Sequence, residues 1–405
     1  MRIFSALFLA STAAALVIET EPEPSPGDVE MEPRSGGELF TFPNKLMRSM
    51  EMCCQDPNYI SCTEITLNFE DFDTEEMKKI SVNGINLEFA SLVPPTGFVY
   101  RNEQGDEAVF SYNKINGHLF GDISTHDGKT FEIESCHHGH VIKEVDVSHL
   151  KNDYVTVPDS VLANVSSRAD HPVDRNTIVT FSVMFYYTAE FEAITADIQG
   201  FIAQVIDITN QGFINSNIPV RATAFCIEKA TISDAQADMN LDALKYMKGS
   251  PEATLNSADA ATLLVAHSNH YCGVAWLHPA YKEWSFSNNV KSCVSTYVVA
   301  HELGHNFGCH HDLESTGGQN WVDSAGFGHF IEGGARTIMA YYKRGYSKVN
   351  YFSNPDVSYQ GQPTGVAGVT NNAAVITKYR FDMADNGDES RQCDSQTTNQ
   401  GLREY

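Results

Sequence analysis

The chain has 405 residues, which is too long for one ordinary hydrophobic core and predicts two or three folded units. Hydrophobic residues make up 42% of it and charged residues 20%, a balance that is typical of globular rather than disordered proteins. With 27 Lys and Arg against 52 Asp and Glu, the formal net charge is -25. A chain this acidic repels phosphates, which argues against a nucleic-acid partner.

The first 18 residues are predicted to be a secretory signal peptide. Arg2 supplies a positive charge, an apolar run follows from Ile3 to Leu9, and Ala13-Ala14-Ala15 fits a small-residue cleavage site. A membrane anchor is the alternative, but the run is short for a bilayer and polar residues interrupt it. No later segment is long and apolar enough to span a membrane, so we expect a secreted, extracellular protein without a membrane span.

Residues 19–38 are predicted to form an extended linker, because acids and prolines fill this stretch and apolar side chains are almost absent. A β-rich segment is expected next, over residues 39–150. Its apolar residues alternate or come in short runs, and the turn pairs Asn83-Gly84, Asn116-Gly117 and Asp127-Gly128 separate them. This pattern is typical of short antiparallel strands.

Residues 151–175 look like a connector, since they are largely polar and contain Pro158 and Pro172. The sequon Asn164-Val165-Ser166 lies in this stretch, so Asn164 is a candidate for glycosylation. We therefore expect an exposed segment between two folded units.

A different pattern begins at residue 176 and continues to about residue 385. Strand-like runs rich in β-branched and aromatic residues alternate there with stretches whose apolar residues recur at helical spacing. Strands that alternate with helices predict an α/β sheet packed by helices, followed by a polar tail over residues 386–405. The expected strands are 177–188, 220–227 and 261–266, and the expected helices are 194–213, 234–247 and 372–379.

The strongest chemical signal is the run His-Glu-Leu-Gly-His-Asn-Phe-Gly-Cys-His-His, which begins at His301. Positions i and i+4 project from nearly the same face of a helix, so His301 and His305 can offer imidazole nitrogens to one metal ion. Glu302 lies about 100° around the helix from His301. Its carboxylate would stand beside the metal, where it can take a proton from a water molecule.

A third ligand is needed to leave one position open on a four-coordinate zinc ion. Gly308 can end the helix because glycine accepts a positive φ, and His311 can then return to the metal. Such sites lower the pKa of bound water to about 7. The alternatives are a chance cluster or a closed structural zinc site, which would more typically have four protein ligands with cysteines prominent.

This pattern resembles the metzincin superfamily of zinc metalloproteases, in which HExxHxxGxxH precedes a methionine-containing turn. Thr337-Ile338-Met339-Ala340-Tyr341 looks like that turn, and Met339 would form the apolar floor under the zinc. Asn306-Phe307 and Asp312 are similar to the adamalysin (reprolysin, ADAM-like) branch. The resemblance covers about residues 176–385. It implies an α/β (α+β) metzincin-like catalytic domain with a mixed sheet and a long active-site helix, preceded by a β-rich prodomain.

The same resemblance suggests how a substrate would bind. The segment Gly273-Val274-Ala275-Trp276-Leu277 would be an edge strand beside the cleft, to which a peptide could add as a further strand. An ordinary core strand is an equal alternative. Tyr341, just after Met339, would help to form the pocket for the residue that follows the scissile bond.

The β-rich segment 39–150 is similar to a reprolysin propeptide, so the protein is expected to be made as a zymogen. Cys136 is the candidate for a cysteine switch, in which a propeptide thiolate binds the zinc. The sequence around Cys136 lacks the usual family context, and a disulfide with Cys53, Cys54 or Cys62 is the alternative. The propeptide cleavage site stays open, because no dibasic site precedes residue 177.

Nine cysteines suit an oxidising compartment, and because nine is odd at least one stays outside the intramolecular pairs. Cys272 and Cys293 flank the segment that enters the active-site helix, and we expect them to pair. The pairing of Cys226, Cys309 and Cys393 stays open.

The sequence therefore predicts a secreted zinc endopeptidase that acts on proteins or peptides. The competing hypotheses are a catalytically silent secreted binding protein that keeps a metzincin shell, and a structural zinc domain in an interaction protein. Glu302 together with all three histidines argues against a silent protein. Calcium binding is left open because no loop has a compelling ligand spacing. The natural substrate and the oligomeric state are also left open.

Overall fold

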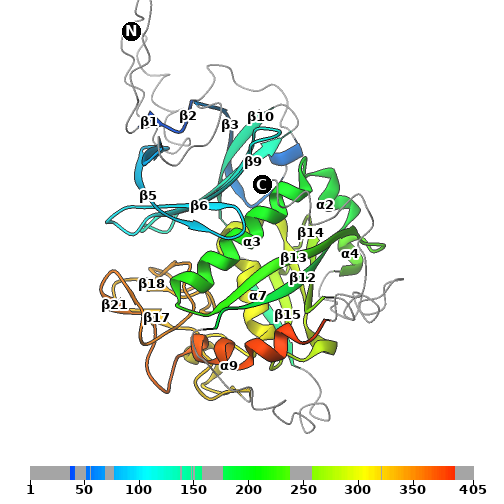
Figure 1. The fold of residues 1–405 in the computed structure, drawn as a ribbon, viewed down its shortest axis with the longest axis vertical. Coiled ribbons are helices and arrows are strands. Elements are labelled where there is room, and N and C mark those ends of the chain that lie inside the picture. The colour runs from blue at the N-terminus through cyan, green and yellow to red at the C-terminus, as the bar shows by residue number, and fades with distance from the viewer. Residues whose placement is uncertain are drawn as a thin grey trace, which may run out of the picture.

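The computed structural model describes residues 37–41, 52–54, 56–68, 77–136, 139–146, 148, 151–156, 177–237, 258–320 and 322–387. The signal peptide expected over residues 1–18, Asn164, and most of the expected linker, connector and tail lie outside these ranges. Within them the chain forms two large sheets with a long helix between them (Figure 1). No helix in the described part is both long and apolar enough to cross a membrane.

The first sheet has ten strands in the order β1-β4-β5-β6-β7-β8-β9-β10-β3-β2 among the described residues. Its paired strands are antiparallel except β1 and β4, which agrees with the hairpin pattern of the sequence. Between β4 and β5, Asn83 and Gly84 have φ values of 54° and 77°, as a two-residue hairpin turn requires. The strands are β1 (Gly37–Glu38), β2 (Phe40–Thr41), β3 (Tyr59–Leu67), β4 (Lys79–Val82), β5 (Ile85–Val93), β6 (Gly97–Arg101), β7 (Glu107–Asn113), β8 (His118–Ser124), β9 (Thr130–Cys136) and β10 (Gly139–Val145).

The second sheet has six strands in the order β11-β15-β16-β14-β12-β13 among the described residues. It is mixed, because β12, β13, β14 and β16 run parallel whereas β15 is antiparallel to β16. A mixed sheet is what the sequence resemblance implies. The strands are β11 (Lys151–Thr156), β12 (Val179–Tyr187), β13 (Val220–Lys229), β14 (Ala260–Val265), β15 (Tyr271–Leu277) and β16 (Phe286–Val290).

The outermost strand of this second sheet differs from the expectation. The sequence predicts a connector over residues 151–175, and for 273–277 it predicts either an edge strand beside the cleft or an ordinary core strand. In the structure, Lys151–Thr156 forms β11, which pairs in parallel with β15 and takes the edge position. The physical reason is that an edge strand presents unpaired N–H and C=O groups, which a nearby extended segment can satisfy. Both edges of strand β15 are therefore paired, one with β11 and the other with β16.

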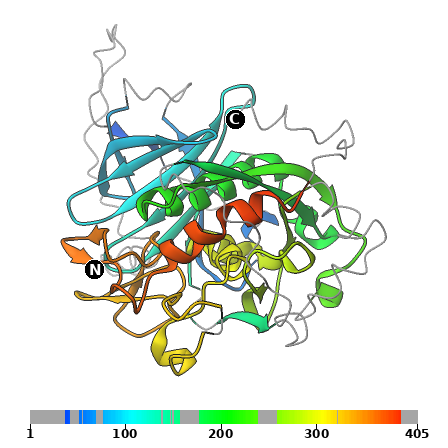
Figure 2. The ribbon, with the colours of Figure 1, turned by 60° about the horizontal axis from the view of Figure 1, so that its bottom comes forward.

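Helix α3 (Ile198–Asn215) lies between the two sheets, as Figures 1 and 2 show. It begins after residue 194 because Asp197 caps it, accepting a hydrogen bond from the Gly200 amide at 2.9 Å. The expected long active-site helix is instead the nine-residue helix α7 (Val298–Asn306), which follows a 3-10 helix. The remaining elements are α2 (Ala189–Ala193), α4 (Asp234–Ala237), α8 (Leu313–Thr316), α9 (Asn372–Ala384), η1 (Met52–Cys54), η2 (Lys282–Trp284), η3 (Lys291–Thr296), β17 (Phe330–Ile331), β18 (Ala335–Arg336), β19 (Ser347–Lys348), β20 (Ser358–Tyr359) and β21 (Gln362–Pro363).

The contact between α3 and the first sheet includes buried hydrogen bonds. Gln204 donates to the Asp122 carboxylate at 2.7 Å. Asp207 accepts from the hydroxyls of Ser111 and Thr96 at 2.5 and 3.0 Å, and burial raises its pKa to about 7. These bonds satisfy groups that burial would otherwise penalise, so they make the contact specific as well as apolar.

A buried charge cluster also joins the two parts of the chain. Lys291, in η3, donates to both carboxylate oxygens of Glu134 at 2.8 and 2.9 Å. Lys143 donates to Glu132 at 2.5 Å and to Glu134 at 2.6 Å. Two ammonium groups therefore face two carboxylates, and loss of any one of them would leave an uncompensated charge in the interior.

Four phenylalanines join α3, the second sheet and the metal-binding segments. Phe181 of β12 packs edge-on against Phe213 and Phe307, with ring centroids 6.3 and 5.4 Å apart. Phe352 stacks on Phe213 at 5.5 Å. All four side chains are buried, so a single apolar cluster fixes where α7 ends relative to α3.

Truncation of Phe213 should destabilise the protein strongly, because it removes a ring that contacts two others and leaves a cavity. We expect Phe213→Ala to lower the free energy of unfolding by about 3–5 kcal/mol, measured by urea unfolding under oxidising conditions. The half-buried Phe330, in β17, serves as the control, and Phe330→Ala should cost clearly less. Equal losses in both variants would contradict the role assigned to the cluster.

Candidate metal centre

Helix α7 carries the first two histidines and ends where the sequence predicts a turn. Gly308 has a φ of 95°, and its amide donates to the His305 carbonyl at 2.8 Å. A Cβ at Gly308 would come within 2.4 Å of the Val322 side chain. Glycine is therefore required at this position for space as well as for conformation.

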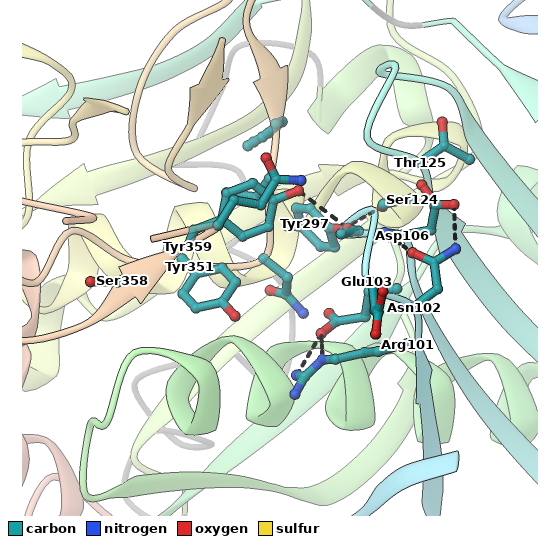
Figure 3. Close-up of a pocket in the computed structure, with 16 residues that line it drawn as sticks. Arg101, Asn102, Glu103, Asp106, Ser124, Thr125, Tyr297, Tyr351, Ser358 and Tyr359 are labelled. Carbon is teal, nitrogen blue, oxygen red and sulfur yellow. Dashed lines mark hydrogen bonds and ion pairs between the residues drawn. The ribbon is translucent and has the colours of Figure 1, made fainter. Parts of the chain in front are cut away.

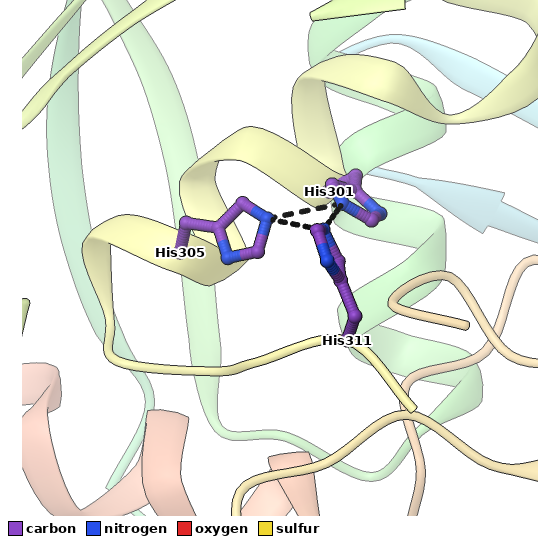
Figure 4. Close-up of side chains that lie close together, drawn as sticks. All are labelled: His301, His305 and His311. Atoms are coloured by element: carbon purple, nitrogen blue, oxygen red, sulfur yellow. Dashed lines mark hydrogen bonds between the residues drawn. The ribbon is translucent and has the colours of Figure 1, made fainter. Parts of the chain in front are cut away.

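The turn brings His311 back to His301 and His305, and all three side chains are buried (Figure 4). The Nε2 atoms are 3.1 Å apart for His301 and His305, 3.0 Å for His305 and His311, and 3.2 Å for His301 and His311. A tetrahedral site with Zn–N bonds of about 2.0–2.1 Å has edges of roughly 3.3 Å. The three donors therefore fit zinc. They form the one cluster of His, Cys, Asp or Glu suited to a metal in the part of the chain that the structure describes.

Backbone carbonyls fix the orientation of two of the rings. His301 Nδ1 lies 2.8 Å from the Ile338 carbonyl, and His305 Nδ1 lies 2.8 Å from the Cys309 carbonyl. Because a carbonyl only accepts, Nδ1 carries the proton and Nε2 keeps its lone pair for a metal. Burial lowers the pKa of His305 to about 3 and holds the pKa values of His301 and His311 well below their ordinary value. The rings are therefore neutral near pH 7, as ligation requires.

The catalytic candidate Glu302 is fully buried between α7 and β15. Its position depends on Gly273, where a Cβ would come within 2.5 Å of Glu302 Oε1 and within 2.6 Å of Val298 Cγ2. A larger residue at 273 would push the helix away from the sheet. Sequence reasoning missed this role, although a glycine inside an apolar strand signals a close approach.

The segment after the third histidine lies beside the cluster. Met339 is fully buried, and a Cβ at Gly304 of α7 would come within 2.6 Å of its Sδ atom. The Tyr341 ring lies on the His311 ring, with centroids 3.8 Å apart. Asp312 accepts a hydrogen bond from the Tyr341 amide at 3.1 Å, which ties the residue after His311 to the methionine-containing turn.

Cys136 is placed in a disulfide rather than near the histidines. It is bonded to Cys53, and Cys54 is bonded to Cys62. A disulfide sulfur is not a thiolate, and only a thiolate binds zinc. The structure therefore corrects the cysteine-switch hypothesis in favour of the alternative disulfide.

The remaining cysteines are also placed. Cys272 and Cys293, which are expected to pair, are joined by a bond of 2.05 Å, and Cys226 is disulfide-bonded too. Cys309 is a buried free thiol whose sulfur lies 3.7 Å from the Asn372 carbonyl. Burial raises the pKa of the Cys309 thiol, and this residue is not part of the histidine cluster. Cys393 lies outside the described residues.

Comparisons with known proteins place this region in a family. Residues 179–353 match the profile of a reprolysin family described as metallo-peptidase family M12. Two proteins of Stenotrophomonas maltophilia, both named peptidyl-Asp metalloendopeptidase, are 26% and 28% identical over 275 and 278 residues. A Xanthomonas campestris protein of the same name is 24% identical over 323 residues. The Stenotrophomonas matches cover 64% of this chain and 66% of those proteins, and the Xanthomonas match covers 74% and 76%.

The similarity to a solved metalloproteinase structure is weak. Metalloproteinase-II from Bacteroides fragilis has a TM-score of 0.38 and 11% identity, over 69% of this chain and 87% of that chain. The assignment therefore depends on the sequence comparisons and on the three buried histidines. Together they show that residues 179–353 are a metzincin-type metallopeptidase region, as the sequence pattern predicts.

Proposed function

We propose that the protein is a secreted, zinc-dependent endopeptidase that is made as a zymogen. The observation that carries the proposal is the convergence of three neutral, buried imidazoles on one point, with Glu302 on the same helix. Three nitrogen donors leave a four-coordinate zinc ion one open position. A structural site would more typically be closed by a fourth protein ligand, and Cys309 is not in the cluster.

The roles of the residues follow from their positions. His301, His305 and His311 would hold the metal, and Met339 would support α7 beneath them. A bound zinc ion supplies a Lewis acid that polarises the scissile carbonyl and acidifies water. The Glu302 carboxylate accepts the proton of the attacking water and delivers it to the leaving amine nitrogen. Glu302 is offset by about 100° from His301 on the helix, so it reaches the water without replacing a metal ligand.

The occupied edge of β15 supports the zymogen part of the proposal. Strand β11 comes from the segment between the β-rich sheet and the metallopeptidase region, and it pairs with β15 along most of its length. While β11 stays there, an extended substrate cannot add to β15 beside Glu302. The buried Lys291–Glu134 pair and the hydrogen bonds of α3 would keep the β-rich segment in place until it is removed.

The proposed substrate preference is taken from the names of the relatives, and the proposed location from the sequence and the disulfides. The relatives' names refer to peptidyl-Asp, and we propose for this chain a preference for peptide bonds next to an aspartate. Secretion is supported by the signal-like N-terminus and by the disulfides, which form and persist in oxidising compartments.

Replacement of Glu302 by glutamine should abolish cleavage and keep the metal, because the amide preserves the shape of the side chain but cannot accept a proton. We expect kcat to fall about 10²–10⁴-fold, with bound zinc unchanged by elemental analysis. The control is Glu314→Gln, at an exposed acid that pairs with Lys343, which should keep wild-type activity. Wild-type cleavage by the Glu302→Gln protein would rule out the assigned mechanism.

Removal of the metal with a chelator should abolish cleavage and lower the midpoint of thermal unfolding, because zinc binds the folded state. A ligand present at 1,000 times its Kd contributes roughly 4 kcal/mol. Added zinc should restore both properties in the wild type but not in His305→Ala. The control is His270→Ala, at an exposed histidine outside the cluster. Full activity of metal-free protein would contradict the zinc assignment.

Disruption of β11 should activate the uncleaved chain. The double substitution Tyr154→Pro and Val155→Pro removes two consecutive backbone N–H donors, so the pairing with β15 loses hydrogen bonds whichever residue donates. We expect peptide cleavage by the intact chain to rise about tenfold, with chain length checked by mass spectrometry. The matched double alanine variant keeps both N–H groups and should stay latent. Equal activity of the two variants would show that β11 does not block the site.

A further inference from the structure

Two basic side chains lie directly opposite each other near the metal centre. Strands β18 and β19 run parallel, and Arg336 is the register partner of Lys348. Neighbouring strands are about 4.8 Å apart, so the two side chains leave the sheet close together. Like charges in this arrangement destabilise a sheet. An anion bound between the two side chains would offset this repulsion.

No carboxylate forms an ion pair with either residue among the described parts of the chain, although acids outnumber bases almost two to one. The Arg336 guanidinium donates to the carbonyls of Ala340 at 2.6 Å and Tyr346 at 3.3 Å. By contrast, the buried lysines 143 and 291 both bind Glu134. Asp312, whose negative charge acts to raise the pKa of Arg336, accepts hydrogen bonds from the amides of Ser315 and Tyr341 instead.

The pair lines a cavity that shares Tyr341 with the surroundings of the histidine cluster. This cavity, of about 680 Å³, is lined by Arg336, Lys348, Tyr297 and Tyr341, and by Cys272 at the start of β15. Tyr341 is the residue whose ring lies on His311, so the same wall serves the cavity and the metal centre. Burial and the neighbouring Arg336 lower the pKa of Lys348, whereas Glu302 raises it, which places Lys348 within electrostatic reach of Glu302.

Lys348 also lines a second, smaller cavity, of about 220 Å³, between the first sheet and the C-terminal part of the chain (Figure 3). There, Arg101 is paired with Glu107 at 2.6 Å, so this lining carboxylate already has a cation. Two acids from the β-rich part of the chain, Asp127 and Asp146, line the larger cavity together with Lys348. The β-rich part also contributes His126 and Lys129 to this lining, whereas the metallopeptidase region contributes Arg336 and Lys348 and no carboxylate. On the metallopeptidase side the charged groups of the cavity are therefore basic, which suits an acidic ligand.

We propose that Lys348 and Arg336 are specificity-determining residues that bind the side-chain carboxylate of an acidic substrate residue next to the scissile bond. The inference rests on the proposed endopeptidase function and adds the groups that would select the substrate. The guanidinium offers a planar set of donors and the ammonium a point charge, a combination that a carboxylate satisfies and a neutral amide does not.

The test compares peptides that differ only by aspartate or asparagine, placed on either side of the scissile bond. The full chain is expressed, allowed to mature and loaded with zinc, and kcat/KM is measured for each peptide. We expect the wild type to prefer aspartate by roughly 30-fold or more. Lys348→Met and Arg336→Met should each reduce the aspartate-to-asparagine ratio about tenfold, whereas the conservative Lys348→Arg should keep most of it.

Lys343→Met is the matched control, because Lys343 lies nearby but is partly exposed and paired with Glu314. It should leave the ratio unchanged. The inference is wrong if the wild type cleaves both peptides equally well, or if Lys348→Met and Arg336→Met lower both rates by the same factor, which would indicate an effect on folding or on Glu302. A zinc-loaded wild type that cleaves no peptide of a broad library would instead overturn the proposed function itself.

Discussion

Three uncharged imidazoles must point at one spot, and most of the structure around α7 follows from that requirement. Two of the rings are oriented by carbonyls that belong to other segments, that of Ile338 in the methionine-containing turn and that of Cys309 after the helix. The centre therefore exists only when α7, the turn at Gly308 and the segment around Met339 are all in place. Burial keeps the rings neutral, and it also makes the cluster costly unless each ring has a partner.

Close packing makes this arrangement possible. Gly273 lets Glu302 approach β15, and Gly304 leaves room for the sulfur of Met339. The phenylalanine cluster around Phe213 then holds the end of α7 against α3 and the segment that contains Phe352. A change at any of these positions would alter the metal centre without touching a ligand.

The parts of the site that are local in sequence could be predicted from it. His301, His305, Gly308 and His311 lie within one helix and its turn, where residue spacing determines geometry. Strand β11 could not be predicted, because its partner β15 lies far along the chain and the polar composition of residues 151–156 resembles a connector. The pairing of Arg336 with Lys348 depends on the register of two-residue strands, which leave no periodic signal.

The same limit explains Cys136. Spacing alone allows it to reach a metal or any of three cysteines, and only the fold places the 3-10 helix with Cys53 beside the end of β9. By contrast, the hairpins of the first sheet follow turn pairs such as Asn83-Gly84, in which the preferred backbone conformation is set by the two residues themselves.

Strand β11 has a consequence for the protein before it meets any substrate. A long apolar strand with an unpaired edge is a template for association with other chains, and β15 is buried and apolar throughout. With β11 attached, the backbone groups at this edge of β15 are paired while the chain folds and is transported. If β11 is removed on activation, as proposed above, the edge that would admit a peptide would also admit a second copy of the protein. The unpaired N–H and C=O groups of β15 would then be open both to a substrate peptide and to another copy of the protein, and association through them would lower solubility.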